Sequence, residues 1–431
     1  MGDWQLLDDS HKSVTTAHDA YKLLSHSNLD ELKKQTPSSL PFGCPQTQTV
    51  FLSMLAIKQW LGIANVEIYC KGLDKIRKVP GHRNVIAPNH PNLFDSIVTR
   101  FVLYVTKQVV PFTAAINTLA KVPLVNKLLK DNGTFFIDVK RFGDLDYREQ
   151  VNSFMRNVTD SGEWLCFYPE GDRTAHERQR ILRHGLLSAM VDKPCAFTPV
   201  SISYEKIPHS YVSSIGRVYV EFHDPILHDS LDYLPDLVSK LSEDLQMGVN
   251  AYTTDLVATI LLNRSVGETL SLEELEAEVD WLRAVLVSRE VPYVEVPLEK
   301  ALHFLNVKVQ ESSVTVPEEQ SWLLSHRERI LHALYDLADP PPFLVSEFAW
   351  TPPASLILDE RLRDLASKAI SPLVMMYSAI ITLLDQGVND VSVIEKAVVT
   401  PQITIQAVRN TFRILQAQEI VAVKDGLVSL N

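Results

Sequence analysis

Residues 84–95 have the sequence NVIAPNHPNLFD, and the rest of the chain is organised around this stretch. Its apolar beginning predicts a buried strand, and residues 96–104 after it predict a helix. His90 and Asp95 therefore lie where a strand turns into a helix. A neutral imidazole can take a proton from a hydroxyl, and a carboxylate can hold that imidazole in the right tautomer and stabilise its charged form. The pair suits attack by a hydroxyl on an activated acyl group.

A simpler interpretation of His90 and Asp95 is that one of them caps the helix. The chain contains 13 histidines. A His-x4-Asp pair is therefore expected by chance roughly once in such a sequence. The pair alone does not separate the two interpretations, and the remaining sequence has to decide between them.

Charge is distributed unevenly along the chain. The 431 residues carry a net charge of −12, which argues against bulk nucleic-acid binding and against strong attraction to an anionic membrane. Residues 71–145 differ, with 12 Lys and Arg against 5 Asp and Glu, or net +7. Such a basic stretch is either an ordinary solvated surface or a surface that faces phosphates or lipid headgroups.

The sequence predicts no metal site. Its four cysteines show no metal-ligand spacing, and Cys166 and Cys195 lie in apolar contexts that predict buried thiols. Buried free thiols fit a reducing compartment. Asp138 and Asp144 are oxygen donors, but no His or Cys ligand accompanies them.

We also expect no membrane-spanning segment. A span needs about 18 apolar residues, and the nearest run, residues 372–384, is shorter and predicts a core helix. The N-terminus shows no secretory signal segment. We therefore expect a cytoplasmic protein that, if membranes matter, is associated with them peripherally, lying on the surface rather than spanning the bilayer.

Apolar strands alternate with helices through the first half of the chain. The predicted strands are 66–70, 84–88, 111–114, 133–138, 164–168, 197–203 and 217–222. The predicted helices are 51–61, 96–104, 124–129, 148–157 and 185–190. This order predicts an α/β fold with a largely parallel central sheet and flanking helices. Ligands then bind beyond the strand ends, where we expect His90, Gly133 and Glu170.

The second half of the chain predicts a mainly helical region. From residue 231 the pattern turns helical, and residues 270–286 form a predicted helix with Ser271 as its cap. Near the end, helices over 391–399 and 401–418 precede a hairpin that turns at Asp425-Gly426. This outline is that of a winged helix, but few Lys or Arg accompany it, so that we expect no nucleic-acid partner.

Four blocks follow one another in a distinctive order. The blocks are the opening stretch, 133–138 (GTFFID), 167–174 (FYPEGDRT) and 198–205 (TPVSISYE). In order and spacing they resemble the four sequence blocks of the glycerol-phosphate and lysophosphatidate acyltransferase superfamily. Residues 201–207 and 254–262 are most similar to its glycerol-3-phosphate and dihydroxyacetone-phosphate branch. The resemblance covers about residues 50–305.

The resemblance implies acyl transfer from a thioester to a hydroxyl in phospholipid biosynthesis. The donor would be acyl-CoA or an acyl-carrier protein, acting as a co-substrate, and the acceptor glycerol-3-phosphate or a related phosphorylated molecule, with no further cofactor. His90 matches the family's catalytic base and Asp95 its partner. We expect an N-terminal flank over 1–48, an acyltransferase domain over 49–265 and a helical region over 266–431, with the winged-helix-like end at 375–431.

The remaining site residues are also implied by the resemblance. Glu170, Gly171 and Arg173 match the block that binds the phosphorylated acceptor, and a guanidinium can bind two phosphate oxygens at once. Gly133 matches the glycine of the second block, and Pro199 the proline of the fourth. The alternatives are a surface ion pair between Glu170 and Arg173, a turn at Gly133, and a strand that begins at Pro199.

Three departures from the family pattern concern the acceptor. Val139 stands where the family usually has arginine, and on a strand only Arg141 shares its side, so that Arg141 is the expected replacement. Asp172 replaces a threonine and would repel a phosphate. An insertion after Glu205 is nearly absent. Two alternatives therefore remain, an acyltransferase with a non-phosphorylated or secondary-metabolite acceptor and a non-catalytic scaffold of the same fold.

Overall fold

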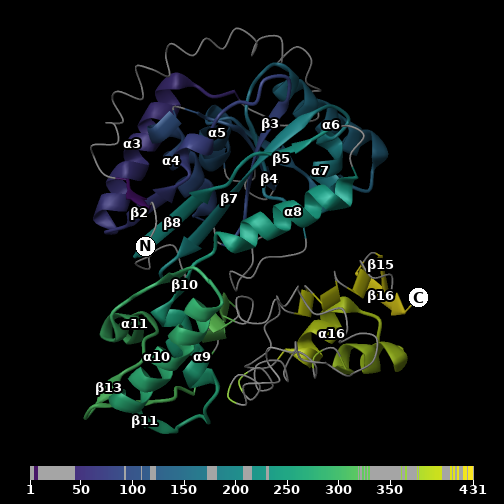
Figure 1. Ribbon diagram of the computed structural model, residues 1–431. Helices are drawn as coiled ribbons and strands as arrows, with labels where there is room; N and C mark the ends of the chain where they lie inside the picture. Colours follow the sequence, from purple (N-terminus) through teal and green to yellow (C-terminus); the bar gives the residue numbers. More distant parts are fainter. Residues whose placement is uncertain are drawn as a thin grey trace. The chain divides into compact units, whose positions relative to one another are not determined.

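A computed structural model describes most of the first half of the chain and parts of the second (Figure 1). The described residues are 4–7, 44–91, 94–107, 109–116, 123–171, 182–206, 216–229, 233–318, 320, 323–324, 326–327, 329–330, 361, 365, 376, 378–399, 408–409, 411–412, 415–416, 421–424 and 426–430. The chain divides into two compact units, Met1–Arg173 with Leu182–Val249 and Thr174–Ile181 with Asn250–Asn431. The domain boundaries expected at residues 48 and 265 stay predictions.

A mostly parallel sheet forms the centre of the first unit. Its strands are β1 (Gln5–Leu6), β2 (Glu67–Lys71), β3 (Arg83–Pro88), β4 (Phe112–Ile116), β5 (Thr134–Ile137), β6 (Leu165–Cys166), β7 (Cys195–Tyr204), β8 (Arg217–Phe222) and β9 (Ile226–His228). Among the described residues their order is β1-β2-β8-β7-β3-β6-β4-β5, with β9 paired to β7. From β7 to β5 neighbouring strands run parallel, and β8 is antiparallel to β7. The predicted α/β class is therefore confirmed.

Helices cover both faces of this sheet (Figure 1). They are α3 (Thr47–Ile63), α4 (Asp95–Lys107), α5 (Pro123–Asp131), α6 (Leu145–Asp160), α7 (His184–Met190) and α8 (Leu234–Met247). One apolar cluster joins α3 and α4 to the sheet, and a second joins α6, α7 and α8 to it. Strand β7 serves both clusters because its side chains alternate, with Ile202 and Tyr204 in the first and Phe197 in the second.

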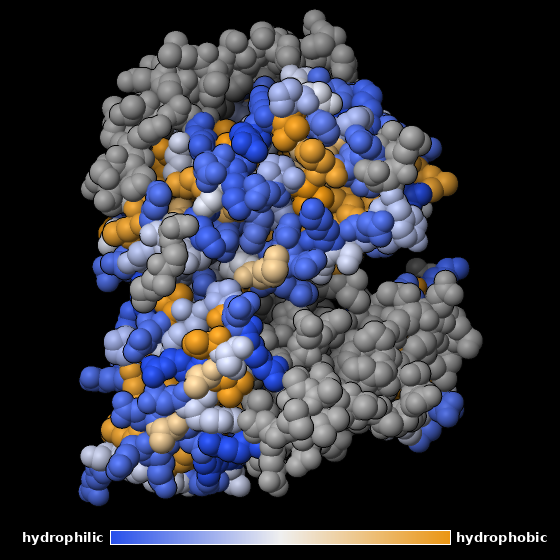
Figure 2. Space-filling view, in the orientation of Figure 1, coloured by the Kyte–Doolittle hydropathy of each residue, from blue (hydrophilic) through white to orange (hydrophobic). Residues whose placement is uncertain are grey.

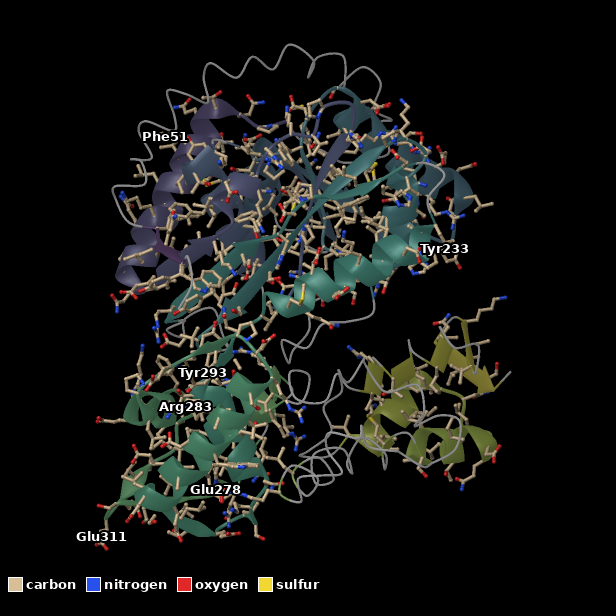
Figure 3. The ribbon with its side chains drawn as sticks, in the orientation of Figure 1. Phe51, Tyr233, Glu278, Arg283, Tyr293 and Glu311 are labelled. Carbon is tan, nitrogen blue, oxygen red and sulfur yellow. The ribbon has the colours of Figure 1, made fainter. Side chains whose placement is uncertain are left out.

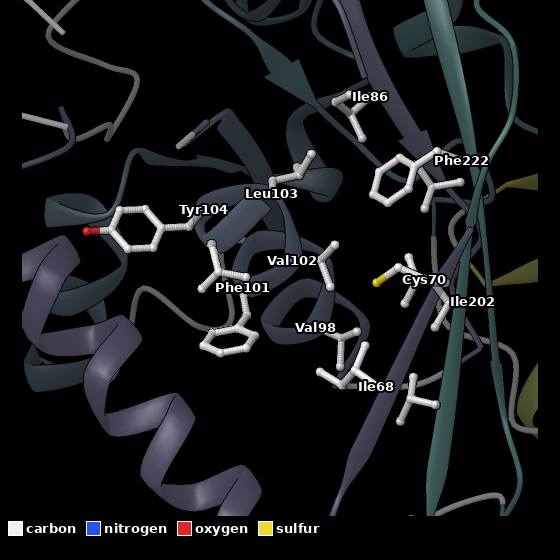
Figure 4. Packing of buried hydrophobic residues seen from close by; sticks show 14 of the residues in the cluster. Ile68, Cys70, Ile86, Val98, Phe101, Val102, Leu103, Tyr104, Ile202 and Phe222 are labelled. Atoms are coloured by element: carbon white, nitrogen blue, oxygen red, sulfur yellow. The ribbon is translucent and has the colours of Figure 1, made fainter. Parts of the chain in front are cut away.

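Helix α4 is the element that carries the opening motif onto the sheet. Its buried residues Val98, Phe101, Val102 and Val105 follow helical spacing and form one apolar face. Figure 4 shows Val98 and Val102 of this face toward strand residues that include Ile202. The helix starts at Asp95, where a carboxylate is favoured by the unpaired backbone N–H groups of the first turn. The apolar face therefore fixes where Asp95 lies.

The surface of the first unit consists mostly of polar residues, with apolar residues interspersed among them (Figure 2). On α3, Phe51 packs half-buried against the first cluster (Figure 3). Leu52 and Ile63 on the same helix are 53% and 87% exposed. Among the described residues, no helix is both long and apolar enough to cross a membrane.

The second unit combines helices with short strands. Its helices include α9 (Thr253–Leu262), α10 (Leu272–Ser288) and α11 (Leu298–Phe304), and Ser271 caps α10 as predicted, its Oγ accepting the N–H of Glu274 at 3.1 Å. Strands β10 (Ala251–Tyr252) and β12 (Tyr293–Val294) pair in parallel. The hydroxyls of Tyr293 and Thr253 lie 2.7 Å apart beside this pair (Figure 3).

A small sheet in this unit was not expected from the sequence. It consists of β11 (Thr269–Ser271), β13 (Val309–Gln310) and β14 (Ser313–Thr315), in the order β11-β14-β13. Such short strands carry too little alternating pattern to be recognised in a region that is otherwise helical.

Near the end of the chain, the described residues form a helix and a hairpin where the sequence predicted them. Helix α16 (Val391–Val398) matches the helix expected over 391–399. Strands β15 (Val421–Lys424) and β16 (Leu427–Leu430) form the antiparallel hairpin around the expected turn. A separate apolar cluster, which includes Ile394 and Val428, holds these elements together. Most of the helix predicted over 401–418 lies outside the described residues.

All four cysteines are buried and none forms a disulfide, which confirms the prediction of buried thiols at Cys166 and Cys195. Burial raises the pKa of Cys70, Cys166 and Cys195 to about 12. At pH 8 about one such thiol in ten thousand is ionised.

We therefore expect the native protein to react slowly with the thiol reagent DTNB at pH 8. In guanidinium chloride, where burial is lost, all four thiols should react within minutes. Absorbance of the released thiolate measures both, with free cysteine as the control for reagent activity. A thiol that reacts at the rate of free cysteine in the native protein would contradict this expectation.

Candidate active site

The residues that follow the parallel strands meet at one edge of the sheet, which we call the carboxyl edge. His90 follows β3, Glu170 follows β6, and Tyr204 ends β7. Because β3 lies between β6 and β7, and neighbouring strands are about 4.8 Å apart, these side chains are within reach of one another. The sheet order thus gathers residues from three of the sequence blocks.

His90 and Asp95 form a hydrogen-bonded pair. The Nδ1 atom of His90 lies 2.9 Å from Oδ2 of Asp95, and the Asp95 carboxylate is fully buried. The hydroxyl of Tyr204 donates to the other oxygen, Oδ1, at 2.6 Å. Since an ionised carboxylate only accepts hydrogen bonds, Nδ1 of His90 carries the proton and Nε2 keeps a free lone pair. His90 retains 18% of its side-chain exposure, so that a substrate hydroxyl can approach it.

Two residues after β6 hold His90 from another side. The backbone N–H of His90 donates to Oε1 of Glu170 at 2.8 Å, and Glu170 is only 2% exposed. The ring of Tyr168 stacks on the imidazole, with centroids 4.1 Å apart and an angle of 27° between planes. Burial raises the pKa of the Tyr168 hydroxyl well above its usual value, so it stays neutral. An aromatic face also favours the charged form of the imidazole.

Asn89 fixes the point where the chain leaves the sheet. Its side-chain oxygen accepts the N–H of Ile202 at 2.8 Å, and its side-chain nitrogen donates to the Ile202 carbonyl at 3.1 Å. Its own backbone N–H donates to the carbonyl of Val200 at 3.0 Å. The amide side chain therefore continues the pairing with β7 beyond the last residue of β3, directly before His90.

The backbone conformation and the close packing at position 171 require a glycine. Its φ is +69°, and a Cβ at this position would lie 2.5 Å from Cδ of Arg183. The Arg183 side chain thus lies against the backbone beside Glu170, and the N–H of Arg183 donates to the carbonyl of Pro169 at 2.7 Å. Arg173 lies outside the described residues, and so does the ion pair considered for it.

Arg141 lies on the carboxyl edge but not on a strand. The strand argument for its orientation is wrong, because Val139–Arg141 form a short 3-10 helix. Its guanidinium carbon lies 4.3 Å from the centroid of the Tyr147 ring, and its charge faces Asp144 at 3.7 Å. Strand β5 is three positions from β3 in the sheet, so Arg141 is about 14 Å or more from His90.

Gly133 and Pro199 are placed differently from what the sequence suggested. Gly133 precedes β5, at the edge opposite to His90, so the expected position beyond a strand end is wrong. Its φ of +80° and its position before the strand fit a turn. Pro199 lies buried within β7, opposite Ala87 of β3, and does not begin the strand. Substrate-binding roles for both residues stay predictions.

Metal ligation finds no support in the described part of the chain. No group of three or more His, Cys, Asp or Glu side chains is placed there to hold an ion. What the carboxyl edge offers instead is an oriented imidazole beside a buried carboxylate, an arrangement for proton transfer.

Known proteins resemble this chain in the same region. Residues 67–203, which contain His90, Asp95 and Glu170, match the family described as Acyltransferase. They form an acyltransferase-family domain. This match confirms the resemblance expected from the four sequence blocks.

Curated relatives of the acyltransferase domain carry a common name. Glycerol-3-phosphate acyltransferases of Xanthomonas axonopodis pv. citri (strain 306) and Xylella fastidiosa (strain 9a5c) are 27% and 28% identical over 231 and 275 residues. These alignments cover 44% and 50% of this chain, and 26% and 31% of the relatives. The chain thus spans about a third or less of the length of these relatives. The solved 1-acyl-sn-glycerophosphate acyltransferase PlsC from Thermotoga maritima is 17% identical, with a TM-score of 0.37, covering 54% of this chain and 85% of that one.

Four residues of the acyltransferase domain that contact the site were not assigned roles from the sequence. They are Asn89, Tyr168, Arg183 and Tyr204. Three of them lie inside the quoted blocks, so the blocks could have drawn attention to them. Their partners depend on which strands are neighbours, and the order of strands in a sheet is not visible in the local pattern.

The Glu170 contact generates a stability prediction. Glu170→Ala removes the carboxylate that accepts the His90 N–H, which costs about 1–3 kcal/mol. We expect the midpoint of thermal unfolding to fall by about 2–8 °C. Glu170→Gln keeps an accepting oxygen and should lose less. Glu243→Ala, on the exposed side of α8, is the control. Equal midpoints for Glu170→Ala and the control would contradict the contact.

Proposed function

We propose that this chain transfers a fatty acyl group from a thioester to a hydroxyl of glycerol-3-phosphate or a related phosphorylated acceptor. The donor is acyl-CoA or an acyl-carrier protein, and His90 acts as the general base. One observation carries the proposal: Nδ1 of His90 lies 2.9 Å from the buried Asp95 carboxylate, so that Nε2 of this partly exposed imidazole can act as the base, within an acyltransferase-family domain.

The proposed reaction needs no covalent enzyme intermediate, because a thioester is already activated. Nε2 of His90 takes the proton of the acceptor hydroxyl as its oxygen attacks the thioester carbonyl carbon. The tetrahedral intermediate collapses, the carbon–sulfur bond breaks, and His90 returns the proton to the leaving sulfur. Asp95 stabilises the imidazolium between the two steps.

Support for a phosphorylated acceptor comes from the relatives' names and from nearby cations. Arg183 lies against Gly171 beside Glu170, and a guanidinium suits a phosphate. Asp172 opposes this acceptor by its charge. The same residue favours a second candidate, an acceptor hydroxyl without a phosphate.

Association with a membrane surface is part of the proposal, since fatty acyl products partition into lipid. On α3, Leu52 and Ile63 expose apolar side chains, and α5 exposes Leu128. Residues 71–145 add a net charge of +7, which anionic headgroups attract. Exposed apolar groups combined with positive charge are the features of a peripheral membrane contact.

The His90 assignment predicts loss of turnover. With a long-chain acyl-CoA and glycerol-3-phosphate, thiol release by His90→Ala should fall by about 10²–10⁴. For Asp95→Asn the rate of thiol release should fall by about 10³–10⁴, because the imidazole is no longer held in the tautomer with Nδ1 protonated and has no countercharge. Release of CoA thiol measures the rate, and the buried protein thiols contribute little background. His303→Ala, an exposed histidine of α11, is the matched control.

Near-wild-type release by His90→Ala would overturn the role of this residue as base. A panel of glycerol-3-phosphate, dihydroxyacetone phosphate and glycerol decides the acceptor class. Preference for glycerol over both phosphates would replace the leading proposal with the second candidate. No release with any acceptor and either donor would favour the non-catalytic scaffold.

The membrane contact predicts binding to anionic vesicles. Wild-type protein should sediment with phosphatidylglycerol–phosphatidylcholine vesicles, and Ile63→Glu should bind about tenfold less because its side chain no longer enters the apolar layer. Val266→Glu changes an equally apolar residue in the second unit, 54% exposed, and serves as control. If both variants sediment equally with the vesicles, α3 does not contact the membrane.

A further inference from the structure

Two described side chains contact the buried carboxylate of Asp95, and only one of them belongs to the recognised motif. His90 Nδ1 lies 2.9 Å from Oδ2, while the Tyr204 hydroxyl donates to Oδ1 at 2.6 Å. Tyr204 is the last residue of β7, is fully buried, and belongs to the apolar cluster that packs α4 on the sheet. The two partners come from the ends of neighbouring strands and meet at the first residue of α4.

We propose that Tyr204 is a positioning residue of the acyl-transfer site, acting through Asp95. Its hydroxyl holds the carboxylate with Oδ2 toward His90 and draws part of the negative charge toward Oδ1. Tyr204 thereby sets both the orientation of the base and the negative charge that faces its Nδ1. The catalytic part of this inference rests on the proposed function, and the effect on the His90 imidazole does not.

The geometry shows why the hydroxyl has this effect. A carboxylate that receives a short O–H bond is stabilised, and its charge is partly neutralised. In a buried site, little water is present to replace that bond. Without the hydroxyl, more negative charge faces Nδ1 of His90, so the imidazolium becomes more stable and the pKa of His90 rises. The base then remains protonated to a higher pH.

Several other charged and titratable groups lie around the pair. Arg100 of α4 acts on Tyr168 and Cys166 and stays positive. Burial raises the pKa of Tyr168 well above its usual value and that of Cys166 to about 12, so both stay neutral. Glu170 bonds the His90 backbone from the β6 side.

On the β7 side, the residue after Tyr204 is also charged. Glu205 is buried and pairs with Arg217 of β8 at 2.8 Å, so this charge is compensated within the sheet. None of these groups is altered when the Tyr204 hydroxyl is removed. A shift in the titration of His90 can therefore be traced to the Tyr204–Asp95 contact.

The test is Tyr204→Phe, which removes one oxygen atom and keeps the ring. Tyr104→Phe is the matched control: Tyr104 is a fully buried tyrosine of the same cluster, nine residues beyond Asp95 on α4, or about 13 Å along the helix axis. NMR titration of the imidazole signals, with His90 assigned by its absence in His90→Ala, gives the pKa directly. Thiol release across pH 5–9 gives kcat and KM.

For Tyr204→Phe we expect the imidazole signals of His90 to titrate at higher pH than in the wild type, because more negative charge faces Nδ1. The acid limb of the kcat profile should move to higher pH by the same amount. At the pH optimum kcat should fall about tenfold, with the KM values little changed, since Tyr204 is fully buried. Tyr104→Phe should match the wild type in all three measurements.

A double variant separates positioning from packing. If Tyr204 acts through Asp95, adding Tyr204→Phe to Asp95→Asn should cost almost nothing further in kcat. Independent, multiplying losses in the double variant would overturn the proposal. An unshifted His90 titration in folded Tyr204→Phe, or an equal shift in Tyr104→Phe, would do the same.

The two proposals fail in different ways. If the wild-type protein releases no thiol with any acceptor, the proposed function fails, and the imidazole titration still decides whether Tyr204 governs His90. If the wild type is active and the titration of Tyr204→Phe is unchanged, the function stands and the role of Tyr204 is rejected.

Discussion

The buried carboxylate of Asp95 is the interaction on which the site depends. It lies at the junction of three elements: His90 after β3, Tyr204 at the end of β7, and the first turn of α4. Burying a carboxylate is costly unless it is fully hydrogen-bonded. The strands must therefore end where they do, and α4 must begin where it does, for this charge to be tolerated. A requirement of stability and a requirement of chemistry are met by the same three side chains.

The apolar core explains why this junction is rigid. Val98 and Val102 hold helix α4 against the strands, as Figure 4 shows, and β7 contributes side chains to the clusters on both faces of the sheet. Close-packed interiors allow little displacement of a helix relative to its sheet. His90 is further fixed by Glu170 and by the stacked ring of Tyr168, so the base is oriented before any substrate arrives.

Much of this architecture could be predicted from the sequence, and the predictions that were wrong or missing have identifiable physical causes. Alternating apolar runs located the strands and helices around His90, and block order indicated the family. The same pattern does not say at which end of a strand a residue lies in space, so Gly133 was expected near His90 and lies at the opposite edge. Arg141 was assigned to a strand because the 3-10 turn after β5 has no distinct local pattern. Tyr204 could not be assigned, since its partner is more than a hundred residues away.

Asn89 has a consequence for how the tasks at this site are divided. By pairing through its side chain with Ile202, it completes the contact between β3 and β7 before the chain turns away from the sheet. The position of the next residue is then set by an anchor on its N-terminal side. The backbone at His90 is thus fixed by a side chain that takes no part in proton transfer, so that placing the base and providing its countercharge are tasks of different residues.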